Sequence, residues 1–403
     1  MSAYLDALGV ICALGQGKRA VLDNLLAGNS PGMRVQAGWL PERSVPVGAV
    51  DAELPAMPPG FAERNTRNNR LLLAAALEIE GDIRQAIEHH GAQRIGVVLG
   101  TSTTGIHEAS EGIAALLHDG AFPPEYSYRH QELVAPAAFL ADWLQLSGPT
   151  YSISTACTSS GRALLSARRL LDLGVCDAVL CGGVDSLCGL TLNGFDALEA
   201  LSDETCNPFS RQRKGINIGE GAALFLMTRE PSASAAPIAL LGAGASSDAH
   251  HISAPEPTGR GALLAMRKAL KSAALDAGHI DYLNLHGTAT THNDAMESLA
   301  VAELFPEGVP CSSSKPLSGH TLGAAGALEA AFCWLCLGPA NRDSLLPPQV
   351  WDGLVDPALP RLNLVAPGSV ASRPLRYLMS NSFAFGGNNV SLILGLVDPE
   401  GGA

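Results

Sequence analysis

Short apolar segments alternate along the chain with longer segments in which apolar residues recur every three or four positions. The short apolar runs have the length and composition of buried strands, and they span residues 94–100, 177–183 and 282–286. The segments with helical spacing span residues 71–90, 159–173, 261–277 and 321–337. Strands that alternate with helices predict βαβ units and a layered α/β fold.

The alternation restarts after a predicted linker in the middle of the chain. Residues 231–237, PSASAAP, have the composition of a linker. A new strand is expected at 238–244, and a final strand at 390–397. We therefore predict two similar halves, residues 1–235 and 236–403, built from a duplicated α/β unit.

Composition narrows the class of protein. The chain has 403 residues, of which 47% are hydrophobic and 16% charged, enough for a large buried core. The net charge of −13 argues against a nucleic-acid surface. Nine scattered cysteines predict a reducing compartment rather than a disulfide framework. Neither a signal peptide nor an apolar run of about 18 residues is evident, so we expect a cytoplasmic protein without a membrane span.

Cys157 is the first candidate for chemistry. It stands in STACTSSG, residues 154–161, between an apolar strand and a helix. A thiol at a helix N-terminus is activated by the helix dipole, and the free backbone N–H groups there can bind an oxyanion. A buried structural cysteine explains this segment equally well.

Two histidines and a lysine form the second set of candidates. His286 begins HGTAT at the end of an expected strand, where active sites of α/β proteins collect. Lys315 lies in a serine loop, and His320 opens a helix of very small residues. The dipole of that helix is expected to keep His320 neutral. Near the C-terminus, Phe385 precedes two glycines that predict a tight, mobile turn.

The order of these segments resembles the β-ketoacyl-acyl-carrier-protein synthase family, of the elongating Cys-His-His type within the thiolase superfamily. The resemblance covers nearly the whole chain. It implies a thiolase-like fold of duplicated βαβαβαββ units, in an α-β-α-β-α sandwich. It also implies an acyltransferase that condenses malonyl-carrier protein with an acyl chain, without a metal or other cofactor. The expected partners are acyl carrier protein and a second subunit, in a homodimer or in a heterodimer with a chain-length factor.

The resemblance implies a role for each matching residue. Cys157 would be the nucleophile, and the backbone N–H groups of Cys157 and Phe385 the oxyanion hole. His286 and His320 would stabilise the enolate that forms when malonyl loses CO2. The remaining matches are Lys315 as electrostatic support held by Glu329, Thr288 and Thr290 along the substrate channel, Phe383 and Phe385 at the gate, and Asp294 and Glu297 as structural acids.

Several positions depart from the usual family pattern. Ala384 stands where glycine is common, Asn388 where threonine is common, and Lys214 where aspartate is common. Because alanine resists positive φ, we expect an altered gate. These departures favour a specialised pathway, such as aryl polyenes or other polyketide-like chains, over housekeeping fatty-acid synthesis.

Other interpretations remain open. A thiolase would need a second late cysteine, and a non-catalytic chain-length factor would lack Cys157. Cys333 and Cys336 form a Cys-x-x-Cys inside an apolar helix, which predicts core packing rather than a metal site. Arg64, Arg67 and Arg70 recur at helical spacing, and we predict that they dock the acidic carrier protein, with Arg211, Arg213 and Lys214 as further candidates.

Overall fold

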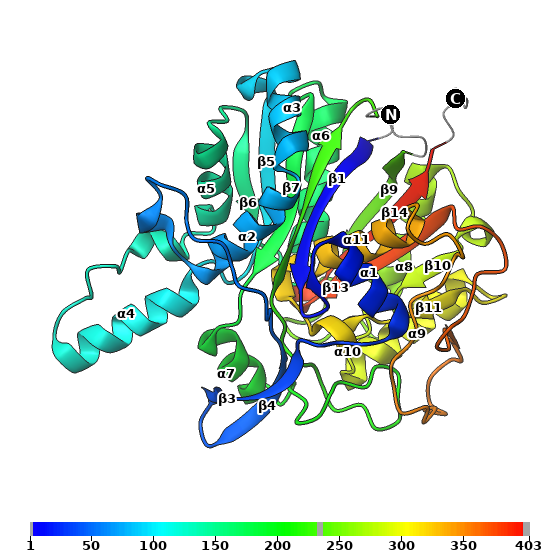
Figure 1. Cartoon of the computed structure of the whole chain (residues 1–403). Coiled ribbons are helices and arrows are strands. Elements are labelled where there is room, and N and C mark those ends of the chain that lie inside the picture. Colours follow the sequence, from blue (N-terminus) through cyan, green and yellow to red (C-terminus); the bar gives the residue numbers. More distant parts are fainter. Residues whose placement is uncertain (1–2, 232–236, 398–403) are drawn as a thin grey trace.

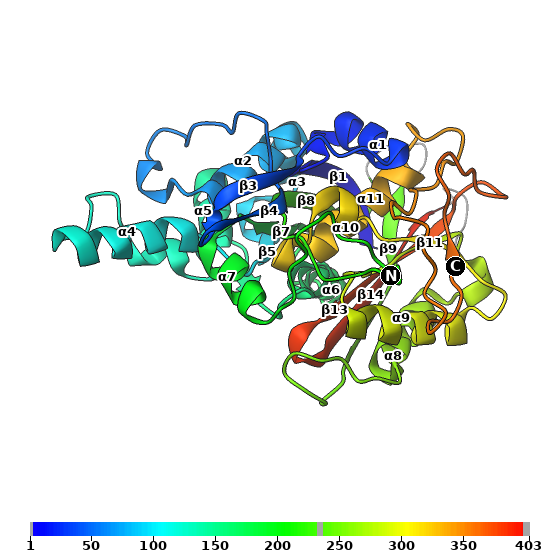
Figure 2. The same cartoon turned by 90° about the horizontal axis from the view of Figure 1, so that it is seen from below.

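The computed structural model describes residues 3–231 and 237–397. Helices and sheets alternate in five layers, with two helices enclosed between the sheets and other helices on both outer faces (Figures 1 and 2). This arrangement confirms the predicted α-β-α-β-α sandwich.

The two halves repeat one strand topology. The N-terminal half contains β1 (Ala3–Cys12), β5 (Ile95–Gly100), β6 (Thr150–Ile153), β7 (Ala178–Asp185) and β8 (Gly221–Thr228), in the order β1-β8-β7-β5-β6. The C-terminal half contains β9 (Ile238–Ser247), β10 (Tyr282–Asn284), β11 (Pro310–Ser312), β13 (Tyr377–Ala384) and β14 (Asn388–Leu396), in the order β9-β14-β13-β10-β11. In each half the first two pairings are antiparallel and the last two parallel. The unit is therefore duplicated, as predicted.

The halves are joined rather than separate. Ala3 and Tyr4 of β1 pair with Leu240 and Ala239 of β9, which makes one continuous sheet. Short strands β2 (Gly15–Gln16) and β12 (Asn363–Leu364) extend it, and β3 (Met33–Leu40) and β4 (Arg43–Gly48) form a separate hairpin. The boundary predicted at residues 235 and 236 falls in the stretch 232–236, which lies outside the described residues, and the domain limits stay a prediction.

Helices fill the three helical layers. The inner pair is α6 (Ser159–Asp172) and α11 (Ala325–Leu337). The N-terminal sheet is covered by α2 (Arg67–Glu78), α3 (Glu80–His90) and α5 (Ala135–Leu144), and the C-terminal sheet by α8 (Arg260–Ala273) and α9 (Thr291–Leu304). The remaining helices are α1 (Lys18–Ala27), α4 (Ile106–Asp119), α7 (Gly189–Ala197) and α10 (Lys315–Ser318), and the 3₁₀ turns are η1 (Ala62–Arg64), η2 (Ala92–Arg94), η3 (Tyr128–Gln131), η4 (Ala277–His279), η5 (Leu322–Ala324) and η6 (Phe385–Gly387).

The inner helices approach closely because glycines face each other. A Cβ on Gly326 of α11 would lie 2.9 Å from the backbone nitrogen of Gly161 in α6, so a side chain there would separate the two helices. Leu164 and Leu328, with Phe332, belong to the same buried cluster. The small residues that the sequence places after His320 thus allow this close packing.

Two predicted helices differ from the helices in the structure, one by a break in its middle and one at its start. The helix expected over 71–90 is two helices, because Ile79 leaves helical geometry at φ −122° and ψ 18°. Ile79 is buried, so the apolar period continues across the break and hides it in the sequence. The helix expected from residue 321 begins with the 3₁₀ turn η5 and becomes α-helical at Ala325.

Two further findings concern the chain as a whole. All nine cysteines are buried free thiols, Cys333 and Cys336 among them. Within residues 3–231 and 237–397, no helix is both long enough and apolar enough to cross a membrane.

Candidate active site

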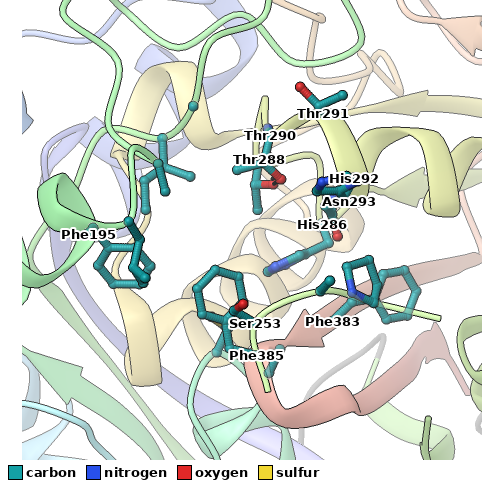
Figure 3. Close-up of a pocket in the computed structure, with 18 of the residues that line it drawn as sticks. Phe195, Ser253, His286, Thr288, Thr290, Thr291, His292, Asn293, Phe383 and Phe385 are labelled. Carbon is teal, nitrogen blue, oxygen red and sulfur yellow. Dashed lines mark hydrogen bonds between the residues drawn. The ribbon is translucent and has the colours of Figure 1, made fainter. Parts of the chain in front are cut away.

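Three of the four predicted catalytic side chains line one cavity of about 530 Å³, those of Cys157, His286 and His320. Cys157 lies between β6 and α6, and His286 follows β10. His320 lies between β11 and α11, and Phe385 lies in the turn between β13 and β14. Phe385, Thr288, Thr290 and Phe383 line the cavity too, and Figure 3 labels these four residues together with His286. Segments that are more than 100 residues apart in the chain therefore form one site.

Cys157 sits on a sharp turn that begins in an unfavourable conformation. Ala156 has φ +52°, which costs a non-glycine residue about 1 kcal/mol or more. Hydrogen bonds hold the turn: the Ser159 hydroxyl donates to the Ala156 carbonyl at 2.6 Å, and the Thr155 N–H donates to the Ser159 hydroxyl at 2.9 Å. The strand-to-helix turn expected for Cys157 is confirmed.

The environment of the Cys157 thiol differs from the expectation of ready ionisation. Burial raises the pKa of Cys157 to about 11, against the opposing effects of the Lys315 charge and of the backbone N–H groups of Phe385 and Cys157. The thiol is therefore protonated at neutral pH. The same two N–H groups, directed at the sulfur, are placed where an oxyanion would form next to it.

Hydrogen bonds fix the proton positions of both histidines. The Leu322 N–H donates to Nδ1 of His320 at 3.2 Å, so Nε2 of the neutral ring carries the proton, and it lies 3.0 Å from Cys157 Sγ. Nζ of Lys315 lies 3.4 Å from His286 Nδ1, which likewise leaves the proton of His286 on Nε2. One nitrogen of each ring and the sulfur all lie within 4.8 Å of one another. With the proton on Nε2, each ring is a hydrogen-bond donor at this nitrogen.

Both histidines are neutral at physiological pH. Burial is the main cause that lowers the pKa of His286 and of His320 well below the usual range, and the Lys315 charge adds to it. The neutral His320 expected from the sequence agrees with this direction. Its principal cause is burial, whereas the sequence argument relied on the helix dipole.

Lys315 is a buried cation with three acceptors. Its side chain is 1% exposed, and Nζ donates to Glu329 Oε1 at 2.6 Å and to the His286 carbonyl. Burial raises the pKa of Glu329, and the Lys315 charge opposes that change. The predicted pairing of these residues is present, and it places a positive charge beside both histidines.

Two more buried carboxylates shape the backbone of the first histidine motif. Glu297 accepts the N–H groups of His286 at 2.8 Å and Gly287 at 2.7 Å. Asp294 accepts the N–H groups of Thr288 at 3.1 Å and Phe209 at 2.8 Å. Burial raises the pKa of Glu297 to about 7 and that of Asp294 to about 6. These contacts to backbone are those of structural acids.

The Phe385 turn closes one wall of the cavity. The Phe385 ring lies 5.7 Å from the Phe195 ring, and both face the cavity in Figure 3. Gly386 and Gly387 have φ +80° and +74°, which favours glycine at both positions. Ala384 has φ −115°, an extended conformation that alanine adopts freely, so the strain expected there is absent.

A neighbouring loop holds this turn in place. The Asp248 N–H donates to the Gly387 carbonyl at 2.8 Å, and the Asp248 carboxylate accepts the Asn389 amide at 2.6 Å. The Gly386 N–H donates to the Ile252 carbonyl at 2.7 Å. Opening of the turn therefore requires these contacts to break.

Two predicted docking residues have internal partners. Arg67 forms an ion pair with Glu220, whose side chain is 0% exposed, at 2.5 Å. The Arg213 side chain is 7% exposed and pairs with Asp356 at 2.6 Å. Both guanidinium groups are therefore engaged by carboxylates of the protein itself, and the docking role of Arg67 and Arg213 stays a prediction.

The other docking candidates divide by exposure. Arg64 pairs with Asp142 at 2.9 Å, and Arg70 donates to the carbonyls of Leu54 and Pro55. Arg211 and Lys214 are exposed, and Lys214 also lines the cavity. Lys214, one of the further candidates from the sequence, is thus an exposed cation at the cavity itself.

Sequence reasoning missed Phe195, the roles of Asp248 and Asn389, and Asp185. Phe195 reads as an ordinary apolar residue, and its contact with Phe385 depends on the fold. Asp185 carried a usable signal in the sequence, because it ends an otherwise apolar strand. The structure shows that its side chain is fully buried.

Comparison with known proteins agrees with this geometry. Residues 7–233 match the family model "Beta-ketoacyl synthase, N-terminal domain", and residues 238–350 match "Beta-ketoacyl synthase, C-terminal domain". Nodulation protein E of Rhizobium meliloti (strain 1021) is 31% identical over 405 residues, covering 96% of this chain and 97% of that protein. The 3-oxoacyl-[acyl-carrier-protein] synthase 2 of the same strain is 38% identical, covering 62% of this chain and 61% of that protein.

A solved structure is more similar in sequence. A ketosynthase (ApeO) in complex with its chain length factor (ApeC), from Xenorhabdus doucetiae, is 47% identical with a TM-score of 0.92, covering 98% of both chains. The synthase models match most of the chain, and the described site contains the cysteine, the two histidines and the lysine expected of such an enzyme. This chain therefore belongs to the β-ketoacyl synthase family of acyltransferases.

Proposed function

We propose that this chain condenses malonyl-carrier protein with an acyl group held on Cys157, and so elongates a fatty-acid, polyene or polyketide-type chain. The observation that carries the proposal is the meeting of Cys157 Sγ with a ring nitrogen of His286 and of His320 within 4.8 Å. A nucleophile and two neutral donors at this distance suit chemistry in which negative charge develops beside a thioester.

The first half-reaction loads the enzyme. The Cys157 sulfur attacks the acyl thioester, the S–C bond to the carrier arm breaks, and the thiol proton goes to the departing carrier thiolate. The backbone N–H groups of Cys157 and Phe385 stabilise the tetrahedral oxyanion. Because the pKa of Cys157 is about 11, the thiol loses its proton as the sulfur attacks rather than beforehand.

The second half-reaction forms the carbon–carbon bond. Malonyl-carrier protein loses CO2, and Nε2–H groups of His286 and His320 hydrogen-bond the resulting enolate oxygen. The enolate carbon attacks the acyl-Cys157 carbonyl, the S–C bond to Cys157 breaks, and the Cys157 thiolate takes up a proton. The product is a β-ketoacyl chain on carrier protein. Thr288 and Thr290 line the route of the carrier arm.

Acyl carrier protein is the proposed donor of both substrates. The name of the 3-oxoacyl-[acyl-carrier-protein] synthase relative supports this choice. Exposed Lys214, which lines the cavity, and exposed Arg211, close to it in the chain, are suited to an acidic partner. Lys214→Glu should weaken carrier-protein binding about tenfold at low salt and less at high salt, whereas Lys271→Glu, an exposed control on α8, should not. Equal affinities in calorimetry would remove Lys214 from the interface.

A synthase-like chain-length factor is the proposed second subunit, in a specialised pathway located in the cytoplasm. The 47% identical ketosynthase was solved with such a factor, and another solved structure, 27% identical, is the ishigamide ketosynthase/chain length factor. Strand β6 ends the described sheet, so its outer edge can accept a strand from another chain. Co-expression with a candidate factor, followed by light scattering, tests this pairing against a homodimer.

Turnover variants test the reaction itself. Cys157→Ala should abolish condensation, and Cys157→Gln should retain decarboxylation of malonyl-carrier protein. Cerulenin, an inhibitor directed at the acyl site, should modify Cys157 alone among the nine cysteines, as read by mass spectrometry. Modification elsewhere with Cys157 intact would refute the assignment. A thiolase reaction is not favoured, because Cys157 is the cysteine that lines the described cavity.

A further inference from the structure

Asp185 is a fully buried carboxylate that has no part in the proposed condensation. It ends β7 and is 0% exposed. Its Oδ1 accepts the N–H groups of Ser102 and Thr103, both at 2.7 Å, and the hydroxyls of Thr101 at 2.9 Å and Thr103 at 2.8 Å. One oxygen thus receives four donors from a single loop of the N-terminal half.

The other oxygen of Asp185 reaches the C-terminal half. Oδ2 accepts the Ala324 N–H at 3.2 Å, a donor shared with the Thr321 carbonyl at 3.0 Å. A Cβ on Gly323 would lie 2.8 Å from this oxygen and 2.6 Å from Ser102 Oγ. The turn from Thr321 to Ala324 is therefore packed directly onto the carboxylate.

That turn sets the proton position on His320. Leu322 has φ +51°, a left-handed conformation that a branched side chain disfavours. In this conformation the Leu322 N–H donates to His320 Nδ1 at 3.2 Å, and Nε2 is 3.0 Å from Cys157 Sγ. Surrounding contacts must hold such a turn, and the contact from Asp185 lies two residues after Leu322.

We propose that Asp185 is a positioning residue for His320. It holds the turn that directs the Leu322 N–H at Nδ1, so that His320 presents a protonated Nε2 to Cys157 and to the substrate. The catalytic consequence rests on the proposed condensation, but the hydrogen bonds themselves can be tested without turnover.

Asp185→Asn separates this role from packing, because the side chains have the same shape. Asparagine keeps one oxygen for the four donors near Thr103, and its NH2 group then faces the Ala324 N–H, donor against donor. The matched control is Asp281→Asn. Asp281 is also a buried carboxylate that accepts two backbone N–H groups, from Arg376 at 2.7 Å and Tyr377 at 2.9 Å, and it does not line the cavity.

The readout is ¹⁵N NMR of histidine-labelled protein, with the His320 signals assigned from the spectrum of His320→Asn. The wild type should show a protonated Nε2 and a hydrogen-bonded Nδ1. In Asp185→Asn the Nδ1 signal should move toward that of a ring without this bond, and signals of the other tautomer should appear. The Leu322 amide should exchange with D2O at least tenfold faster. Asp281→Asn should leave both observations unchanged.

Kinetics supply the second readout. Decarboxylation of malonyl-carrier protein by Asp185→Asn should fall about tenfold in kcat with KM nearly unchanged. If Asp185→Asn does not fold, Thr103→Val should give the same NMR change at a smaller size, because it removes one donor to Asp185 and the acceptor of the Ser186 N–H at nearly constant volume. His320 signals and exchange identical to the wild type in a folded variant would overturn the inference. If the wild-type protein does not condense malonyl-carrier protein with an acyl group, while the NMR changes appear in Asp185→Asn, the proposed function is wrong and the positioning role stands.

Discussion

Replacing Lys315 with methionine removes the buried positive charge at the centre of the site and keeps the length of the side chain. Lys315 is 1% exposed and Glu329 is 3% exposed, and 2.6 Å separates their charged atoms. Removing one partner leaves the other as an uncompensated buried charge. We expect Lys315→Met to lower the free energy of unfolding by about 3–5 kcal/mol. A typical domain has about 5–15 kcal/mol in total, so the variant should fold with a much lower Tm.

The pH dependence of that loss follows from Glu329. Burial already raises its pKa, and loss of the cation raises it further. A carboxyl group whose folded pKa exceeds its unfolded pKa binds protons preferentially in the folded state, so the stability rises as the pH falls through the folded pKa. Lys315→Met should therefore be least stable at alkaline pH. The destabilisation relative to the wild type should shrink as the pH falls.

A double variant separates stability from catalysis. Lys315→Met with Glu329→Gln removes both charges, and its unfolding free energy should return to within about 2 kcal/mol of the wild type. Activity should not return, because His286 Nδ1 still lacks its donor and the cation beside both histidines is absent. Both variants should lose about 10²–10³-fold in kcat for decarboxylation, the cost of removing one donor in comparable sites.

Two assays decide the outcome. Urea unfolding at pH 6 and pH 8 gives the stabilities, and CO2 release from malonyl-carrier protein across a pH series gives the rates. Because Lys315 lowers the pKa of His286 and His320, the acid limb of the rate profile should move to higher pH in both variants. If the double variant recovers its rate together with its stability, Lys315 acts only on folding and the reasoning fails.

Three further predictions follow from individual contacts. Alkylation of Cys157 by iodoacetamide should accelerate about tenfold per pH unit from pH 7 to pH 9.5, because the thiol pKa is about 11, and a plateau near neutral pH would contradict the effect of burial. Arg67→Ala should lower the unfolding free energy by about 3 kcal/mol in urea unfolding, because it leaves buried Glu220 unpaired, and a change below about 1 kcal/mol would argue against that pairing. Gly387→Ala should slow acylation of Cys157 at least tenfold, because the new Cβ would lie 2.8 Å from Asp248 Cβ at φ +74°, while Ala384→Gly should change it less than twofold. Burst-phase acylation measures both gate variants, and equal rates would show that the turn is not a gate.

The sequence predicts most features of the fold and the site that depend on residues close together in the chain. The turn at Cys157 follows from an apolar strand, a cysteine and a run of small polar residues that begins a helix. Pairings between distant residues leave no such pattern. Arg67 and Arg213 read as surface charges because their partners, Glu220 and Asp356, lie 153 and 143 residues away. The order of the strands in the sheet cannot be predicted from any single strand either, because it depends on which apolar faces pack together.

The sequence predicted the direction of the pKa shift correctly for His320 and wrongly for Cys157, and burial explains both results. For His320, burial and the helix N-terminus act in the same direction, so an argument from the dipole alone reaches the observed neutral ring. For Cys157 they oppose each other, and burial outweighs the cation and the backbone donors. Only the fold shows how deeply each group is buried. The direction of a pKa shift can therefore be predicted from the sequence only where burial and the local dipoles or charges act in the same direction.

The duplication also explains why the nucleophile and its donor meet. Cys157 follows β6, the third strand of the N-terminal unit, and precedes α6; His320 follows β11, the third strand of the C-terminal unit, and precedes α11. The two residues thus occupy corresponding places in the two units. Helices α6 and α11 pack against each other at Gly161 and Gly326, near their N-terminal ends, so the segments before them are brought together. The 3.0 Å contact between Cys157 and His320 is therefore a consequence of how the halves pack. The chemistry depends on the interface between the units, and neither unit contains it alone.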